Sequence, residues 1–204
     1  TEINMAGYSD IKVTFVSDEV AADDNFIVTA ARPDTVATLA NTSFASGGAR
    51  ILTVTTAGTS DNAKTNTIVG TDVFGDALTE VITSTGSAEA VDGTKYFLTI
   101  TSVTSSAQFA GNMEVGSIAS AAQAVFSGRV RLKGYSIVST GTAGVVELIN
   151  GTPESGTTLF KAQTIATDNT TTDYVIPNEG VVFANGMSVK YTVGTITMMH
   201  FYYA

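Results

Sequence analysis

The segment GTDVFGDALTEVIT, residues 70–83, places two aspartates around a glycine, the residue types from which calcium-binding loops are built. An EF-hand loop needs oxygen ligands at alternating positions and a glutamate at its twelfth position. Here the apolar residues Val73 and Phe74 stand where ligands would be required. We therefore expect a turn between two strands, capped by Asp72, with Gly75 at a positive φ angle.

The remaining acidic residues also lack the spacing of a metal site or a catalytic pair. Asp23-Asp24-Asn25 offers oxygen atoms to a calcium ion, but short acidic runs of this kind are typical of solvated faces. Glu80, Glu89 and Asp92 are scattered over expected turns and strand faces. A glycosidase would need two carboxylates at a fixed separation across a cleft, which the sequence alone does not show.

His200 is the only histidine, and it lies in the C-terminal segment TMMHFYY. A single histidine excludes multi-histidine zinc sites, and no G-x-S-x-G motif accompanies it. If this segment is a strand, Met198, His200 and Tyr202 share one face, whereas Met199, Phe201 and Tyr203 share the other. We expect a packed or interface histidine, and we predict no enzyme activity, no catalytic residue, no cofactor and no metal.

The aromatic residues present a third possible site, a platform for sugars. Sugar platforms favour tryptophan, and the chain has none. Packing in a core or an interface is the preferred interpretation for the seven candidates. These are Tyr96, Phe97, Tyr135, Tyr174, Phe201, Tyr202 and Tyr203.

Composition bounds the classes of protein that remain. The chain has 204 residues, of which 44% are hydrophobic and 14% charged, so it is long enough for one large or two small domains. Its formal net charge of −9 argues against nucleic acid as a partner. No apolar run approaches the length of a membrane span, and the absence of cysteine excludes disulfides and thiolate metal sites.

The elements that must position these residues are predicted to be strands. Alternation of Ile11, Val13 and Phe15 with more polar neighbours predicts a strand over 10–18. Residues 18–25 are expected to form a charged loop, and a weak helical pattern covers 35–41. Five further strands are predicted, at 51–56, 64–72, 77–85, 94–106 and 111–118.

A second unit follows the small-residue segment 119–126, which is typical of a linker or a single helical turn. In 129–139, Val130 and Leu132 are expected to point inward, and the pattern changes phase at Gly134 as at a β-bulge. Six more strands are predicted, at 144–150, 157–166, 173–177, 180–186, 188–193 and 195–203. This density of short strands favours a β-sandwich or jelly-roll.

The predicted fold class is therefore all-β. We divide the chain into an irregular N-terminal arm or lead-in over 1–50, a β-rich domain over 51–126 and a β-sandwich domain over 127–204.

Two stretches resemble known families. The pattern of a strand, G-T-D-x-x-G, a T-E-x-I/V strand, K-Y-F-x-x-I-T-S-V and G-N-x-x-V-G resembles a module common in virion proteins of tailed phages. The matching positions are Gly70, Thr71, Asp72, Gly75, Thr79, Glu80, Lys95, Tyr96, Phe97, Ile100, Thr101, Ser102, Val103, Gly111, Asn112, Val115 and Gly116. The stretch from GRVRLKGYSIVS to ITMMHFYY is similar to a small β-sandwich found at the ends of phage and prophage structural proteins.

The resemblance, which covers residues 64–204, implies a virion component assembled in a bacterial cytoplasm, with no catalytic residues to carry over. We expect a capsid decoration or cement protein that binds the major capsid protein or other virion proteins and forms a homo-oligomer, preferably a trimer. Neither nucleic acid nor a membrane is an expected partner. A tail or fibre component and a carbohydrate-binding module remain as alternatives.

Overall fold

The prediction of an all-β chain is confirmed by the computed structural model, which describes residues 11–19, 21–32, 35–45, 47–57, 60–86 and 88–204. The described residues form fifteen strands and no helix. The strands are β1 (Lys12–Ser17), β2 (Asp23–Ala31), β3 (Ala49–Thr56), β4 (Thr65–Thr71), β5 (Ala77–Thr83), β6 (Ala90–Phe97), β7 (Thr99–Ser105), β8 (Met113–Phe126), β9 (Val130–Thr140), β10 (Val145–Asn150), β11 (Thr157–Gln163), β12 (Asp168–Val175), β13 (Val181–Phe183), β14 (Met187–Thr192) and β15 (Ile196–Tyr203).

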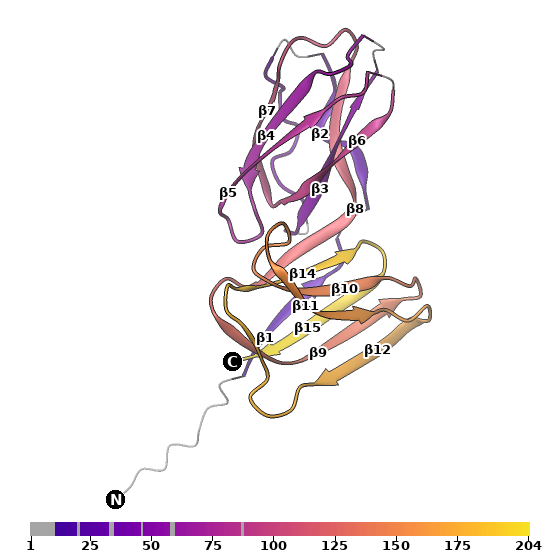
Figure 1. Cartoon of the computed structure of the whole chain (residues 1–204). Coiled ribbons are helices and arrows are strands. Elements are labelled where there is room, and N and C mark those ends of the chain that lie inside the picture. The colour runs from indigo at the N-terminus through magenta and orange to yellow at the C-terminus, as the bar shows by residue number, and fades with distance from the viewer. Residues whose placement is uncertain (1–10, 20, 33–34, 46, 58–59, 87) are drawn as a thin grey trace, which may run out of the picture.

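The strands make two lobes that are joined by one long strand (Figure 1). The upper lobe holds β2 to β7, and the lower lobe holds β1 and β9 to β15. Strand β8 runs through both lobes, pairing with β2 and β3 in its first part and with β14 in its second. As a result, a single sheet of order β11-β10-β14-β8-β3-β6 crosses from one lobe into the other.

The lower lobe is a β-sandwich. One sheet has the order β1-β15-β9-β12, and the other is formed by β11, β10, β14 and the end of β8. The inner face of β9 presents Val130 and Leu132 to a shared apolar core, as the alternation predicts, and the phase changes at Gly134, where both Gly134 and Tyr135 are buried. The pairing of β9 with β15 shifts register at the same place, which confirms the predicted bulge.

The upper lobe packs a three-stranded sheet, of order β5-β4-β7, onto β2, β3 and the first part of β8. Its core comes from alternate residues of these strands, because period-two patterns place every second side chain on the buried face. The largest fully buried side chains here are Ile27, Leu52, Ile68, Phe97, Ile100, Phe109 and Met113.

The expectation of a linker or helical turn over 119–126 is wrong. These residues continue β8, a strand of fourteen residues. Alanine and serine favour strands weakly, but here strand partners on both sides impose the extended conformation: Ala121 faces Arg50 of β3 and Tyr191 of β14. Small side chains also allow Ala121 and Ala122 to be fully buried where the two lobes meet.

The single strand predicted over 94–106 is two strands. β6 ends at Phe97 and β7 begins at Thr99, and the two belong to different sheets. The chain changes sheets at Leu98, whose backbone N–H donates to the carbonyl of Thr71. The helical pattern over 35–41 is also not realised in the part of the chain that is described, where Val36 forms an isolated β-bridge with Thr104.

The irregular arm expected over 1–50 is more regular than predicted. Residues 1–10 lie outside the described residues, but β1 pairs with β15 along its whole length and β2 pairs with β8. The charged loop expected over 18–25 is shorter, because β2 already begins at Asp23. The local sequence does not predict these pairings, because the partner strands lie far along the chain. The residues that pair with β2 and β1 follow about ninety to 190 residues later.

Candidate functional site

The loop at Asp72 is the bend that the sequence predicts. One carboxylate oxygen of Asp72 accepts hydrogen bonds from the backbone N–H groups of Phe74 at 2.8 Å and Asp76 at 3.0 Å. Gly75 has a φ angle of 89°, in the left-handed region that suits glycine. The loop joins the antiparallel strands β4 and β5, and its Asp72 carboxylate is occupied by the turn itself.

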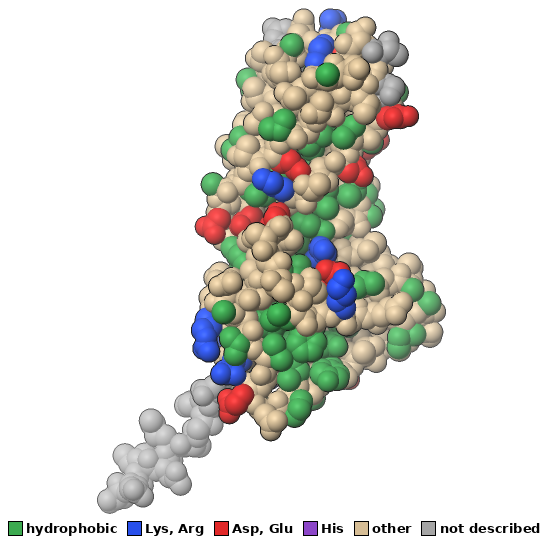
Figure 2. All heavy atoms as spheres, in the orientation of Figure 1, with side chains coloured by type: hydrophobic (Ala, Val, Ile, Leu, Met, Phe, Trp, Pro, Cys, Tyr) green, Lys and Arg blue, Asp and Glu red, His purple; other side chains and the backbone are tan. Residues whose placement is uncertain are grey.

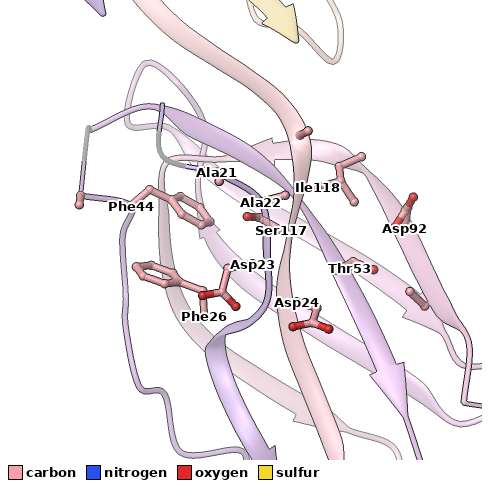
Figure 3. Close-up of a pocket in the computed structure, with 13 residues that line it drawn as sticks. Ala21, Ala22, Asp23, Asp24, Phe26, Phe44, Thr53, Asp92, Ser117 and Ile118 are labelled. Atoms are coloured by element: carbon pink, nitrogen blue, oxygen red, sulfur yellow. The ribbon is translucent and has the colours of Figure 1, made fainter. Parts of the chain in front are cut away.

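Three of the scattered acidic residues line one groove of the upper lobe. Asp23, Asp24 and Asp92 border a cavity of about 890 Å³ whose floor includes Phe26 and Phe44. Figure 3 shows Asp92 across the groove from the two phenylalanines, with Asp23 and Asp24 near each other. No group of three or more acidic or histidine side chains among the described residues lies close enough together to hold a metal ion.

Glu80 and Glu89 do not form a catalytic pair with these residues. The buried carboxylate of Glu80 accepts hydrogen bonds from the N–H and hydroxyl groups of Thr94, at 2.6 and 2.9 Å, and from the N–H of Lys95. It therefore fastens β5 to β6 across two sheets. Glu89 is exposed at the end of the loop before β6.

His200 lies on the outer surface of the lower lobe. The predicted alternation is confirmed, because Met199, Phe201 and Tyr203 are buried in the sandwich core and His200 faces the other way. Its ring is 5.4 Å from the ring of Phe15, which is the residue opposite it on β1. The histidine is half-buried in the surface of the sheet, where it packs against an aromatic neighbour.

This surface, which we call the outer face, is the side of the β1-β15-β9-β12 sheet that turns away from the core. Strand register brings together on it Val13, Phe15, Val138, Val175, Met198, His200 and Tyr202. Phe15 and Val13 are 55% and 54% exposed, and Val175 is 81% exposed. The same register also places Ser136 and Asp173 on this face, beside His200. Apolar side chains that gather on a strand surface are a feature of interaction sites.

Basic side chains border the outer face at one end. Arg131 and Lys133 occupy the outward positions at the start of β9, and Lys12 lies two strands away at the start of β1. Figure 2 shows lysine and arginine side chains at the edge of the lower lobe, near the first described residues. Glu179 lies at the same end, because its backbone carbonyl accepts hydrogen bonds from Arg131 and Lys133.

The seven aromatic residues considered as a sugar platform do not assemble into one surface. Tyr96, Phe97, Tyr135, Phe201 and Tyr203 are buried in three different packing clusters. Tyr174 and Tyr202 are exposed, but they lie on opposite sides of their sheet, because Tyr174 stacks on the inward-facing Tyr135. The preference for core packing is therefore borne out for five of the seven.

Sequence reasoning missed a buried polar network between the lobes. The side-chain NH₂ group of Gln123 donates to the Tyr191 hydroxyl at 3.0 Å, to the carbonyl of Ser17 at 3.0 Å and to a Glu19 carboxylate oxygen at 2.9 Å. The fully buried Arg50 donates to the carbonyl of Ile118 at 2.7 Å. These residues lie at the end of β1 and just after it, and on β3, β8 and β14. The network therefore connects both lobes to β8, the strand that they share.

Burial controls the charge states in this network. It lowers the pKa of the Arg50 guanidinium, against the opposing effect of Glu19, and it raises the pKa of the Tyr191 hydroxyl far above the usual value. Tyr191 consequently stays protonated and donates to the carbonyl of Ser17. Burial also raises the pKa of Asp18, which accepts from the N–H of Gly194.

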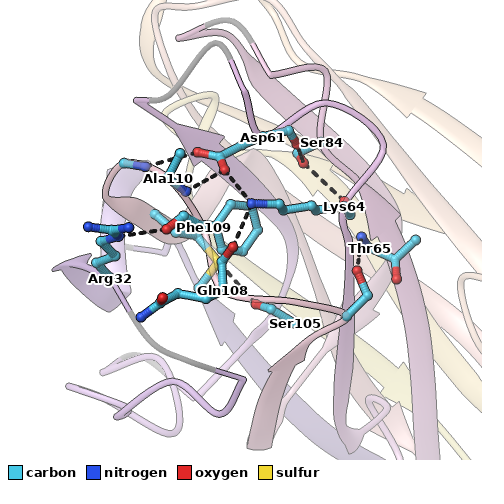
Figure 4. Close-up of polar contacts among 12 residues, drawn as sticks. Arg32, Asp61, Lys64, Thr65, Ser84, Ser105, Gln108, Phe109 and Ala110 are labelled. Carbon is cyan, nitrogen blue, oxygen red and sulfur yellow. Dashed lines mark hydrogen bonds and ion pairs between the residues drawn. The ribbon is translucent and has the colours of Figure 1, made fainter.

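A second missed group is the buried Asp61 in the upper lobe (Figure 4). Its carboxylate accepts from Lys64 Nζ at 2.7 Å, from the N–H of Ala110 at 2.6 Å and from the N–H of Gly111 at 3.2 Å. Burial by itself would raise the pKa of Asp61, but these three donors outweigh it and lower the pKa. This cluster anchors the loop before β8, and its groups are engaged with one another.

Comparisons with protein-family models, with curated proteins and with solved structures found no match to this chain. The described residues contain no helix that is long and apolar enough to cross a membrane. We therefore choose the candidate functional site from the structure alone. It is the outer face of the lower lobe, where strand register gathers exposed apolar side chains.

Proposed function

We propose that the chain is a structural component of a tailed-phage virion, specifically a capsid decoration protein that binds the shell and stabilises it. The resemblance of residues 64–204 to virion modules supports the class of protein. The observation that carries the proposal is the outer face, an apolar strand surface bordered by basic residues. Its partner would be the major capsid protein or another virion protein that offers apolar and acidic groups.

The architecture of the two lobes also supports a role in assembly. Strand β8 belongs to both lobes, so attachment through one lobe would also fix the position of the other. The buried network around Gln123 and Tyr191 reinforces that connection with directional hydrogen bonds. We propose that the lower lobe attaches to the shell and that copies associate as a homotrimer at three-fold positions.

The test is binding of the purified chain to particles of the phage that encodes it, after the particles have been stripped of this protein. Sedimentation with the particles is the expected result. Val13→Glu, on the outer face, should reduce the bound fraction at least about tenfold, because it places a charge in an apolar contact. Val81→Glu is the matched control, since Val81 is a strand valine with 56% exposure in the upper lobe.

Loss of binding in both variants, or in neither, would contradict attachment through the outer face. Absence of the protein from the particles would contradict the virion role itself. Light scattering and negative-stain electron microscopy then test the oligomer. Compact trimers are expected, whereas rings or stacked tubes would indicate a tail component and elongated rods a fibre.

A further inference from the structure

A polar cavity of about 520 Å³ lies where the two lobes meet, apart from the outer face. Its upper side is the turn between β4 and β5, which contributes Phe74 and Asp76. Its lower side is built from Ser127 after β8, the loop from Asn150 to Thr157, and Asn185 before β14. The turn that Asp72 caps thus forms one wall of this cavity.

Several hydrogen-bonding groups of this cavity are not used by the fold. Among the described residues, the side chains of Asp76, Ser127, Thr157 and Asn185 make no hydrogen bond with the protein. The Oδ1 atom of Asn150 accepts from the backbone N–H of Asn185 at 2.9 Å, which orients the amide and leaves its NH₂ group available. The cavity therefore offers a carboxylate, hydroxyls and amides from four separate segments.

The composition of the lining selects among ligand classes. No described residue in it is a lysine or an arginine, so a phosphate or carboxylate ligand would meet the Asp76 carboxylate without a compensating cation. A calcium ion requires six to eight oxygen ligands with several carboxylates, and this cavity supplies one carboxylate. An apolar ligand would leave these polar groups without partners, which is costly.

A neutral polyhydroxylated ligand satisfies these conditions. Its hydroxyls can donate to Asp76 and exchange hydrogen bonds with the amides and hydroxyls, while the ring of Phe74 supplies an apolar surface for its C–H groups. The volume lies in the range of small-ligand sites. We propose that this cavity is a carbohydrate-binding site for a neutral hexose or N-acetylhexosamine unit.

The proposal is independent of the attachment role of the outer face. Saturation-transfer NMR on the full chain tests it, with glucose, galactose, mannose, N-acetylglucosamine, cellobiose and chitobiose as probes. We expect transfer to at least one probe. Asp76→Ala and Asn185→Ala should each weaken its binding at least about tenfold, because each removes a hydrogen-bonding group from a different lobe.

Both variants should fold, since the two side chains make no hydrogen bond within the described part of the protein, and thermal melts check this. Asp92→Ala is the matched control, an exposed aspartate in the groove of the upper lobe, and it should bind like the unaltered chain. The inference is overturned if no probe shows transfer. It is equally overturned if transfer survives unchanged in both cavity variants, or if only Asp92→Ala loses it.

Discussion

The two lobes are stabilised by different means, although both are all-β. The lower lobe is a regular sandwich around a large apolar core, and its salt bridges, from Glu147 to Lys161 and Lys190, lie near the surface. The upper lobe also packs around an apolar core, and in addition it fastens its loops and strands with the buried carboxylates of Asp61 and Glu80. The lower lobe thus relies mainly on its regular apolar sandwich, whereas the upper lobe adds buried polar groups that hold its loops in place.

The two lobes also differ in how many large hydrophobic side chains they expose to solvent. Among the described residues, the large hydrophobic side chains that are exposed in the upper lobe are Val36 and Val81, whereas the lower lobe exposes Ile11, Val13, Phe15, Val145, Leu159, Ile165, Tyr174, Val175 and Tyr202. The upper lobe carries the groove with Asp23, Asp24 and Asp92. The lower lobe therefore has the more apolar surface, which suits contact with other proteins, and the upper lobe has the more acidic surface, which suits contact with water.

The largest expected effect tests the apolar side of this contrast. Phe201→Ala should lower the free energy of unfolding by about 3 to 5 kcal/mol, because Phe201 is fully buried in the sandwich core. Urea denaturation measures it. Tyr202→Ala, at the exposed neighbouring position, should change stability by less than about 0.5 kcal/mol. Similar losses for the two variants would show that the sandwich core is not the main support of this lobe.

The polar side of the contrast is tested by Asp61→Ala. The change leaves the N–H groups of Ala110 and Gly111 without their acceptor and removes the carboxylate partner of the Lys64 ammonium, at an expected cost of about 3 kcal/mol in unfolding free energy. Glu147→Ala in the lower lobe should cost only about 1 kcal/mol, because Lys161 is 64% exposed. An equal loss for both in urea denaturation would remove the distinction between the lobes.

The connection between the lobes is tested by Gln123→Ala. Loss of its three hydrogen bonds should lower the unfolding free energy by about 1 to 2 kcal/mol and make the two lobes unfold less cooperatively. Calorimetry checks this, because the van't Hoff enthalpy should then fall below the calorimetric one. Gln163→Ala, on the exposed face of edge strand β11, should leave both enthalpies unchanged. Two separate transitions in the unaltered chain would contradict the coupling.

A smaller effect concerns acid. Because the folded pKa of Asp61 is below the ordinary value of about 3.9, the unfolded chain binds this proton more readily. The stabilisation is complete above that ordinary value and is lost as the pH falls through the lower folded value. Asp61→Asn should therefore show a flatter decline of unfolding free energy below about pH 4 than the unaltered chain. Parallel declines in urea denaturation at several pH values would contradict this.

Local alternation was sufficient to predict the regular parts of the fold. The inward positions of Val130, Leu132, Met199 and Phe201 follow from period two, and the turn at Asp72 follows from its own residues. The extended conformation of 119–126 could not be predicted from its alanines, because its partners on β3 and β14 impose it. The division at Leu98 was hidden because Tyr96, Phe97 and Leu98 are all apolar.

The polar sites were harder to predict, since each depends on residues that are distant in sequence. Asp61 accepts backbone hydrogen bonds from a loop about fifty residues later, and Gln123 bonds to Ser17 and Tyr191, which come from opposite ends of the chain. The same is true of the cavity, where Asp76 and Asn185 come from different lobes. For Asp72 the sequence was sufficient. The spacing around it excludes a calcium-binding loop, and its carboxylate caps the turn as predicted.

The length of β8 has a mechanical consequence. Force applied along this strand, by pulling the lobes apart, loads the hydrogen bonds to β3 and β14 in shear, so that many of them must break together. Peeling would instead break them one at a time at lower force. The seam between the two lobes therefore resists tension along β8 as one unit rather than opening as a hinge.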